Sequence, residues 1–358
     1  MFVVIMAGGS GTRFWPSSRR GRPKQFLTIL GEDPMVVATC NRLVSLARDE
    51  EMVLVLGQEH LSEAKALFKN RKIHMLAEPV GRNTAPCIGL GAIYAAHLGD
   101  QGPIAFLPAD HFIGDPDVFV ADLKKAGEVA ESGGIVTLGI VPTRPETGYG
   151  YIQRSRTNID TKDERVYPVS AFVEKPDLDA ALQYLESGDY FWNAGIFVAT
   201  PQTIINQMEL YLPDLYNGLK RLKKALGTDN FEKTMSSVYN KLDSISFDYG
   251  IMERTKDPIY VLPSECGWSD VGSWASLYDV RGPEHDKNRN LSDGDPVLVD
   301  CEDSFISNQS ERLVTCLGLK NCLVVDTPEA LLVADLRRAQ EIREIVNKLK
   351  DAKKDELL

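Results

Sequence analysis

Near the start of the chain, glycines and two spaced cations form a group that could bind a polyphosphate. Three glycines follow directly on the apolar run FVVIMA: Gly8, Gly9 and Gly11. Small residues at the end of a strand let backbone N–H groups approach an anion closely. Arg13 and Lys24 lie eleven residues apart in the same segment, so they could reach the phosphates from two sides. A solvated basic loop is the alternative, and the nearby glycines favour phosphate binding.

The two commonest glycine-rich phosphate motifs do not match this segment. A P-loop needs a lysine followed by Ser or Thr after its last glycine, and none stands there. A dinucleotide fingerprint needs G-x-G-x-x-G, whereas Gly9, Ser10 and Gly11 are followed by Thr12, Arg13 and Phe14. A nicotinamide dehydrogenase is therefore disfavoured.

The bulk composition limits the kinds of partner. The 358 residues carry a formal net charge of −11, which disfavours binding to nucleic acid or to anionic membranes. The positive charge near the start would then serve a small anionic ligand. Six cysteines are scattered without a C-x-x-C pair, which predicts reduced thiols in a cytoplasmic protein. No stretch approaches the roughly 20 apolar residues of a membrane span.

Over the first 140 residues, apolar segments of strand length alternate with segments of helical length. We expect strands over 2–7, 52–57, 72–77, 103–110 and 134–141, and helices over 34–47, 59–70, 83–98 and 116–132. Because the strands are apolar on both faces, a largely parallel, Rossmann-like sheet with helices on each face is predicted. Ligands bind beyond the carboxyl ends of such strands, where GGSGTR, EPVGRNTAP and PADHF follow.

Beyond about residue 142 the pattern changes. TGYGYIQRS and RVYPVSAFVEKP are typical of antiparallel strands, and helical segments fill most of 201–256. The polar segment GPEHDKNRNLSDGDP precedes short β-type runs and a charged amphipathic helix over 335–350. We therefore predict an α/β fold with a mixed sheet, a large domain over 1–284 and a small β-rich domain over 285–358.

Eight motifs in this order resemble those of the sugar-1-phosphate nucleotidyltransferases. The first is AGGSGTRFWPSSRRGRPKQF, which is similar to the pattern GxGxRxxPxxxxxPK. The others extend the resemblance over residues 1–275: AEPVGRNTAP, LPADH, PTRPETGYGYI, FVEKPD, WNAGIF, FDYGIMER and WSDVGSW. The form GGSGTRFWP is similar to the branch of this family that transfers GMP to mannose 1-phosphate.

The resemblance implies a reaction of GTP with mannose 1-phosphate that gives GDP-mannose and pyrophosphate. An in-line attack on the α-phosphorus needs positioning and charge neutralisation, which Arg13, Lys24 and a divalent cation would supply. The catalytic residues that the resemblance implies are Arg13, Lys24 and Asp110. The resemblance also implies Mg²⁺, with Asp110 and Asp270 as its ligands. The alternatives are a strand-end turn for Asp110 and a helix N-cap for Asp270.

The resemblance further implies two groups of binding residues. The nucleotide-binding group comprises Ala7, Gly8, Gly9, Gly11, Thr12, Glu78, Pro79, Asn83 and Thr84. Glu78 could accept hydrogen bonds from N1–H and N2–H₂ of guanine, while helix capping is the alternative role of Asn83. The sugar-phosphate group comprises Tyr149, Gly150, Glu174, Lys175, Asn193 and Gly195. A weak surface ion pair is the alternative for Glu174 and Lys175.

Two further functions are compatible with the motifs. One is a thymidylyl- or uridylyltransferase for glucose 1-phosphate, and the other is a non-catalytic relative that binds nucleotide-sugars and regulates partners. A non-catalytic relative would have lost phosphate or metal ligands. The sequence retains all four of the residues expected in these roles: Arg13, Lys24, Asp110 and Asp270. The resemblance also implies a short left-handed β-helix in the C-terminal domain, where we expect a homodimer surface.

Overall fold

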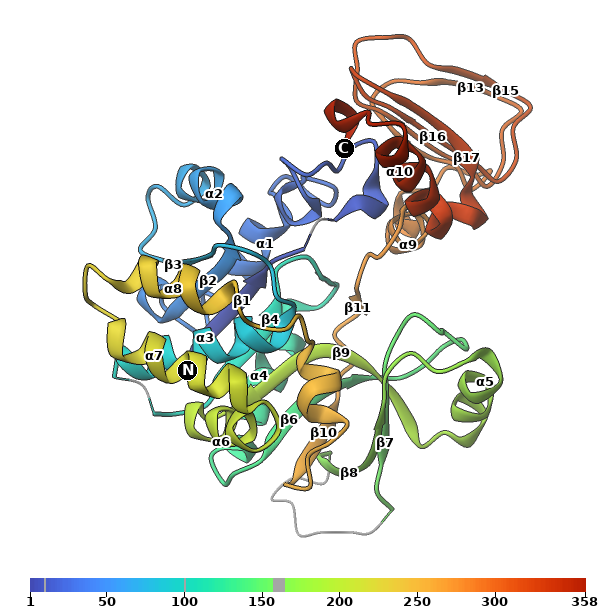
Figure 1. Cartoon of the computed structure of the whole chain (residues 1–358). Helices are drawn as coiled ribbons and strands as arrows, with labels where there is room; N and C mark the ends of the chain where they lie inside the picture. Colours follow the sequence, from blue (N-terminus) through green and yellow to red (C-terminus); the bar gives the residue numbers. More distant parts are fainter. Residues whose placement is uncertain (10, 100, 157–164) are drawn as a thin grey trace. The chain divides into compact units, whose positions relative to one another are not determined.

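The computed structural model describes residues 1–9, 11–99, 101–156 and 165–358, which form two compact units (Figure 1). Unit 1 comprises Met1–Gly9, Val37–Ala109 and Ile113–Trp268, and unit 2 comprises Ser10–Val36, Asp110–Phe112 and Ser269–Leu358. The units are therefore interleaved along the chain, whereas the sequence-based division at residue 284 is linear. Among the described residues, no helix combines the length and apolar character needed to cross a membrane.

A nine-stranded sheet forms the centre of unit 1, in the order β3-β2-β1-β4-β9-β6-β10-β8-β7. Its strands are β1 (Phe2–Ala7), β2 (Met52–Gly57), β3 (His74–Glu78), β4 (Ile104–Pro108), β6 (Ile135–Ile140), β7 (Tyr151–Arg154), β8 (Tyr167–Val173), β9 (Tyr190–Ala199) and β10 (Ile259–Pro263). Strands β3, β2, β1 and β4 are parallel neighbours, while β9 runs antiparallel to β4 and β6. The predicted mixed sheet is confirmed.

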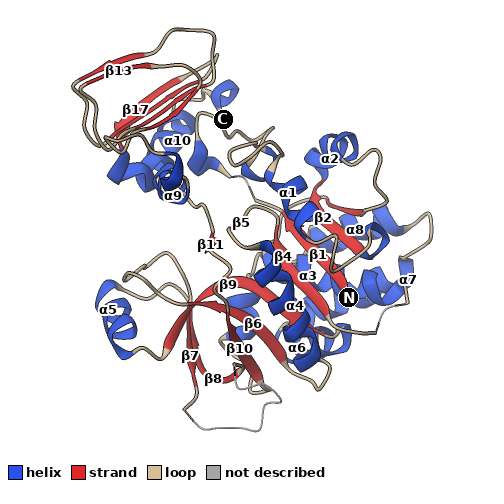
Figure 2. Cartoon of the chain, turned by 180° about the vertical axis from the view of Figure 1, so that it is seen from behind, coloured by secondary structure: helices blue, strands red, loops and turns tan. Residues whose placement is uncertain are grey.

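Helices cover both faces of this sheet. Those of the first half are α1 (Met35–Arg42), α2 (Leu61–Leu67), α3 (Thr84–His97) and α4 (Pro116–Ala130), and those of the second half are α5 (Leu178–Ser187), α6 (Pro201–Tyr211), α7 (Pro213–Ala225) and α8 (Phe231–Tyr239). Figure 1 shows α3, α6, α7 and α8 on the near face, and Figure 2 shows α4 from the opposite side. The helices predicted over 34–47 and 59–70 are shorter than expected, since isolated turns flank them.

Close packing of α3 on β1 fixes the edge of the sheet from which the glycine loop leaves. Val3, Val4 and Ile5 in β1 are fully buried, as their apolar run predicts. A Cβ atom at Gly91 of α3 would lie 2.6 Å from Cγ1 of Val4, so only glycine lets the helix approach this far. The carboxyl end of β1 is consequently held rigidly where Gly8 and Gly9 follow.

Unit 2 contains a β-rich C-terminal portion, as predicted. A four-stranded sheet holds β12 (Leu291–Asp293), β14 (Phe305–Asn308), β16 (Cys322–Asp326) and β17 (Leu331–Asp335), and a two-stranded sheet holds β13 (Val297–Val299) and β15 (Thr315–Leu317). Parallel pairing aligns Leu291 with Phe305 and Phe305 with Leu323, so buried apolar residues stack from one coil to the next. Two helices pack on the coils: α9 (Trp274–Val280) and α10 (Ile342–Asp351).

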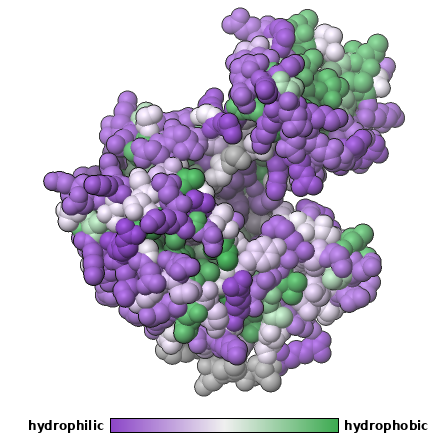
Figure 3. Space-filling model, viewed as in Figure 1, coloured by the Kyte–Doolittle hydropathy of each residue, from purple (hydrophilic) through white to green (hydrophobic). Residues whose placement is uncertain are grey.

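The remaining elements are short. The two-residue strands β5 (Phe112–Ile113) and β11 (Trp268–Ser269) form a further two-stranded sheet. Figure 3 shows a hydrophobic patch over the C-terminal strands, where four apolar side chains are 47–73% exposed: Val297, Val299, Leu313 and Leu317. Such a patch on a protein surface is typical of an interaction site.

Candidate active site

In unit 2, Gly11 precedes two short 3₁₀ turns, Thr12–Phe14 and Lys24–Phe26. Phe14 and Phe26 are buried and anchor these turns in the core. Gly11 has φ +52°, and a Cβ atom there would lie 2.5 Å from the backbone nitrogen of Lys24. Only glycine therefore allows the loop to lie against the turn that carries Lys24.

Lys24 is the centre of a buried polar cluster, with 5% of its surface exposed. Its Nζ donates hydrogen bonds to the carbonyl oxygen of Asp110 at 2.7 Å, to Asp110 Oδ2 at 3.0 Å and to the carbonyl oxygen of Asp270 at 2.6 Å. All three donors of the ammonium group are thereby used. Lys24 thus binds both of the aspartates that are predicted to be metal ligands.

Asp110 is ionised in this setting. Burial acts to raise the pKa of its carboxyl group, but the charges of Lys24 and His111 and the hydrogen bond from Lys24 outweigh burial. The pKa of Asp110 therefore lies below its ordinary value of 3.8. A carboxylate that stays charged at neutral pH is the form that a divalent cation binds.

Asp270 and Arg13 both border the backbone of Gly272. Asp270 Oδ1 accepts a hydrogen bond from the Gly272 N–H at 3.1 Å, and a Cβ atom at Gly272 would lie 2.5 Å from Asp270 Oδ2 and 3.3 Å from Arg13 Nη1. The residue that caps α9 is Ser273, so the interpretation of Asp270 as a helix N-cap is wrong. Unit 2 therefore brings Arg13, Lys24, Asp110 and Asp270 into one neighbourhood.

The donor set of this neighbourhood fits a hard divalent cation. Carboxylate oxygens are the ligands that Mg²⁺ prefers, and the ion commonly takes only one or two of them from protein. Among the residues that the structure describes, no group of three or more His, Cys, Asp or Glu side chains is arranged to hold a metal. An ion held by two carboxylates completes its coordination with phosphate and water oxygens.

Unit 1 contains the predicted base-binding edge, at the carboxyl ends of β1 and β3. A Cβ atom at Gly8 would lie 3.7 Å from Oε2 of Glu78, so the end of β1 adjoins this carboxyl group. Glu78 is 4% exposed, and its Oε1 has no hydrogen-bond partner in the described part of the chain. Burial raises the pKa of Glu78 to about 7, although a hydrogen bond from Tyr239 opposes the shift. A buried oxygen without a partner is a candidate ligand-binding atom.

Polar side chains of the loop after Glu78 form hydrogen bonds within the protein. Asn83 is the N-cap of α3, and its Oδ1 accepts from the Thr84 N–H at 2.9 Å, as the capping alternative expected. Thr84 Oγ1 accepts from the Phe247 N–H at 2.8 Å. Sequence reasoning missed this second contact, because Phe247 lies 163 residues further along the chain.

The predicted sugar-binding residues of unit 1 form a second cluster. A Cβ atom at Gly150 would lie 2.3 Å from Glu174 Oε2 and 3.2 Å from Cβ of Asn193, so a side chain at this position would displace the Glu174 carboxylate. The buried Oε2 of Glu174 has no hydrogen-bond partner among the described residues, while its Oε1 accepts from Lys175. Asn193 Oδ1 accepts from the Gly195 N–H at 2.9 Å. The structure therefore brings Gly150, Glu174, Asn193 and Gly195 together.

Aromatic rings lie beside this cluster. The Tyr149 ring contacts Trp192 and Trp268 edge-on, with ring centroids 5.2 and 5.4 Å apart. The guanidinium of Arg144 lies 5.4 Å from the centroid of Trp192. Lys175 is half-exposed, with φ +51°, and it pairs with Glu174. The predicted surface pair is thus present, although the glutamate side of it is buried.

Asp248 is a polar residue of this cluster that sequence reasoning missed. It begins a π-helical turn, Asp248–Met252, and its Oδ1 accepts from Asn193 Nδ2 at 2.7 Å. Burial and then the charge of Glu174 raise the pKa of Asp248 to about 6. The available signal was the motif FDYGIMER, to which no residue role had been assigned. π-helical turns are frequent at functional sites.

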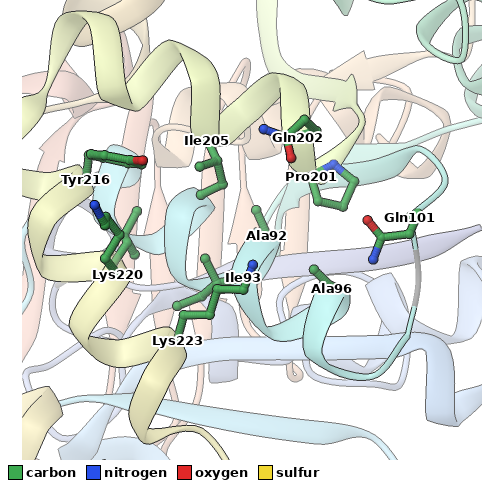
Figure 4. A pocket seen from close by; sticks show the side chains of 11 residues that line it. Ala92, Ile93, Ala96, Gln101, Pro201, Gln202, Ile205, Tyr216, Lys220 and Lys223 are labelled. Carbon is green, nitrogen blue, oxygen red and sulfur yellow. The ribbon is translucent and has the colours of Figure 1, made fainter.

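A separate cavity of about 270 Å³ lies among α3, α6 and α7. Figure 4 shows Ile93 and Ile205 at its apolar floor, with Tyr216, Lys220 and Lys223 from α7 at one side. None of the predicted site residues lines it. The cavity is therefore not the site on which the motifs converge.

Comparison with known proteins agrees with this geometry. A family model described as nucleotidyl transferase matches residues 2–286, and one described as a MannoseP isomerase/GMP-like beta-helix domain matches residues 294–349. The mannose-1-phosphate guanylyltransferase of Escherichia coli (strain K12) is 38% identical, and the alignment covers 98% of this chain and 73% of the relative. The mannose-1-phosphate guanylyltransferase RfbM of Salmonella typhimurium (strain LT2) is 39% identical, and the alignment covers 97% of this chain and 72% of the relative.

A solved structure from Thermus thermophilus also resembles this protein over nearly its whole length. It is described as a mannose-1-phosphate geranyltransferase, and it superposes with a TM-score of 0.87 at 34% identity, covering 98% of this chain and 99% of that one. The C-terminal match confirms that the β-rich portion is β-helix-like. Taken with the site geometry, these matches show that the chain belongs to the nucleotidyl transferase family.

Proposed function

We propose that this protein transfers GMP from GTP to mannose 1-phosphate, which releases pyrophosphate and forms GDP-mannose. The observation that carries the proposal is the buried cluster of Lys24, Asp110 and Asp270 at the end of a glycine loop. The nearly full-length likeness to mannose-1-phosphate guanylyltransferases supports the choice of substrates.

The reaction requires one bond to form and one to break at the same phosphorus. A phosphate oxygen of mannose 1-phosphate attacks the α-phosphorus of GTP, and the bond to the oxygen that bridges the α- and β-phosphates breaks. Pyrophosphate leaves with the bonding electron pair. Catalysis of such a transfer depends on positioning and on neutralising negative charge, so cations are the groups that the protein must supply.

Arg13 and Lys24 are the proposed cations of unit 2. The planar guanidinium of Arg13 suits the leaving pyrophosphate, because it can bind two oxygens at once. The compact ammonium of Lys24 would act on the α-phosphate as a nearby point charge, since its three donors are used by Asp110 and Asp270. The N–H groups of Gly11 and Thr12 are proposed to face the phosphates, together with those of Ala7, Gly8 and Gly9 at the end of β1.

Family membership implies a divalent cation, for which we propose Mg²⁺. Asp110 and Asp270 would hold it, since Lys24 Nζ binds the carboxylate of Asp110 and the backbone carbonyl of Asp270. When bound, the ion neutralises charge on the triphosphate oxygens. In the cluster, Lys24 keeps Asp110 ionised and fixes the backbone of Asp270, which prepares both carboxylates for the cation.

In unit 1 we propose separate roles for two clusters. Glu78 is proposed to accept hydrogen bonds from the N1–H and N2–H₂ donors of guanine. Pro79, Asn83 and Thr84 form the loop beside it. Glu174 accepts hydrogen bonds from vicinal hydroxyls of the sugar, since its Oε2 is the buried oxygen without a partner among the described residues. Asn193 and the backbone of Gly150 and Gly195 complete the sugar site with Tyr149, while the half-exposed Lys175 meets the sugar's phosphate.

A pyrophosphate-release assay tests the proposal directly. Mannose 1-phosphate and glucose 1-phosphate are each offered with GTP, UTP, dTTP and ATP in the presence of Mg²⁺. We expect GTP with mannose 1-phosphate to give the highest kcat/KM. Faster turnover of dTTP or UTP with glucose 1-phosphate would refute the assignment, and no turnover of any pair would favour a non-catalytic, regulatory relative.

We propose a homodimer formed through the exposed apolar side chains of β13 and β15. Val297, Val299 and Leu317 support this proposal, because exposed apolar patches of this kind are typical of protein interfaces. Residues 1–284 would carry the catalytic function and 285–358 the association function, in a cytoplasmic enzyme that draws on the GTP pool there. Light scattering that gives the mass of one 39.7 kDa chain would contradict the dimer.

A further inference from the structure

A four-residue segment of unit 1, residues 245–248, contacts both the predicted nucleotide loop and the predicted sugar cluster. We name it the connector. At the nucleotide loop, the Ile245 N–H donates to the carbonyl oxygen of Arg82 at 3.2 Å, and the Ala85 N–H donates to the carbonyl oxygen of Ile245 at 3.2 Å. The Phe247 N–H donates to Thr84 Oγ1 at 2.8 Å. Three hydrogen bonds therefore join the connector to the loop that follows Glu78.

At the sugar cluster, the connector ends at Asp248. Its Oδ1 accepts the hydrogen bond from Asn193 Nδ2 at 2.7 Å. The same Asn193 side chain accepts from the Gly195 N–H, and the Asn193 N–H donates to the carbonyl oxygen of Gly150 at 2.8 Å. Asp248 thus sets the orientation of the Asn193 amide, which in turn holds the Gly195 N–H, while the backbone of the same residue holds Gly150.

The core beneath the connector leaves little freedom for its two ends to move independently. Phe247 is fully buried, and its ring centroid lies 5.0 Å from that of Phe197 in β9. Ile251 and Met252, in the π-helical turn that follows, are buried as well. Thr84 is bonded to the Phe247 N–H, and Asp248 is the next residue in the chain. Because packed interiors transmit displacements, a displacement of Thr84 is therefore expected to move Asp248 as well.

We propose that Thr84 and Asp248 are positioning residues that couple nucleotide binding to sugar-phosphate binding through the connector. The inference rests on the proposed function, since it assigns the two sites to the nucleotide and to the sugar phosphate. Thr84 acts through the Phe247 N–H, and Asp248 acts through Asn193. A nucleotide that orders the loop around Thr84 thereby also orders the Asn193 amide, so the second ligand binds to a site already arranged.

The test measures coupling rather than affinity alone. The dissociation constant of mannose 1-phosphate is determined by calorimetry with Mg²⁺, without nucleotide and with saturating α,β-methylene-GTP, which cannot release pyrophosphate. The ratio of the two constants is the coupling factor. We expect tighter binding with the analogue in the wild-type protein. In Thr84→Val the factor should fall about threefold to tenfold, since a single hydrogen bond contributes about that much.

Matched variants separate positioning from general damage. Thr84→Ser and Asp248→Asn keep an acceptor oxygen and should retain the coupling factor, whereas Asp248→Ala should lower it as Thr84→Val does. Thr203→Val is the control, because the Thr203 hydroxyl pairs with that of Thr200 at the start of α6. A wild-type coupling factor in Thr84→Val or Asp248→Ala would overturn the inference, even if either variant bound both ligands more weakly.

A failure of the proposed function is distinguishable from a failure of this inference. If the wild-type protein binds no mannose 1-phosphate, the proposed substrates are wrong, and the connector is then judged by amide hydrogen exchange of the ligand-free protein. We expect Thr84→Val, but not Thr203→Val, to speed exchange in peptides that cover 190–197 as well as in those that cover 245–252. Unchanged exchange over 190–197 would overturn the coupling.

Discussion

Replacement of Glu78 by glutamine tests whether this buried carboxyl group is held for a ligand at the expense of stability. The side chain is 4% exposed, its Oε1 has no hydrogen-bond partner among the described residues, and burial raises its pKa to about 7 from an ordinary 4.5. Glutamine has nearly the same shape but never ionises. The substitution therefore removes the charge and leaves the packing.

The sign and size of the effect follow from proton linkage. Below pH 4.5 the carboxyl group is protonated in both the folded and the unfolded chain, so it has no pH-dependent effect on stability. As pH rises toward 7, the unfolded chain releases this proton first, and the free energy of unfolding falls. Well above pH 7 the full penalty is present, about 3 kcal/mol for a pKa difference of this size.

Urea unfolding at a series of pH values measures this penalty. The stability of Glu78→Gln minus that of the wild type should grow by roughly 2–3 kcal/mol between pH 5 and pH 8.5. Glu131→Gln, at an exposed position, is the matched control and should show no such growth. At pH 8 the same Glu78→Gln variant should have a raised KM for GTP. A stability difference that does not change with pH would refute the reasoning.

Three further predictions concern the cluster of unit 2 and the sugar site. Lys24→Ala and Asp110→Asn should each lower kcat at least about a hundredfold with circular dichroism unchanged, since the first removes a cation that neutralises the phosphates and the second removes a carboxylate proposed to hold Mg²⁺ there; near-normal kcat in either variant contradicts its role. Lys175→Ala should raise the KM for mannose 1-phosphate several-fold and leave that for GTP unchanged; equal effects on both would argue against a sugar-phosphate contact. Gly11→Ala should destabilise the protein by about 1–3 kcal/mol in urea unfolding, because of the positive φ and the 2.5 Å approach to Lys24; wild-type stability would contradict this.

The main features of the fold could be predicted from the sequence because they follow from local periodicity. The runs FVVIMA and MVLVLG are apolar throughout, so they predict strands buried on both faces, and both strands have the expected bounds. The β-rich C-terminal portion follows in the same way. The helix predicted over 335–350 begins only at Ile342, because β17 extends to Asp335 and a 3₁₀ segment follows over Leu336–Glu341. The order of strands β9, β6 and β10 in the sheet depends on long-range pairing, which no local pattern reveals.

The residue types of the candidate site were likewise readable from the sequence. Glycines, Arg13, Lys24 and the aspartates are the groups that phosphate chemistry needs, and their motifs identify the family. Only the tertiary structure decided that Lys24 binds Asp110 and the backbone of Asp270, that Ser273 caps α9, and that Thr84 and Asp248 lie at the ends of one connector. These contacts join residues 55–246 positions apart or depend on a competing local cap. Sequence patterns report the periodicity of neighbouring residues, whereas such contacts are set by the packing of the whole chain.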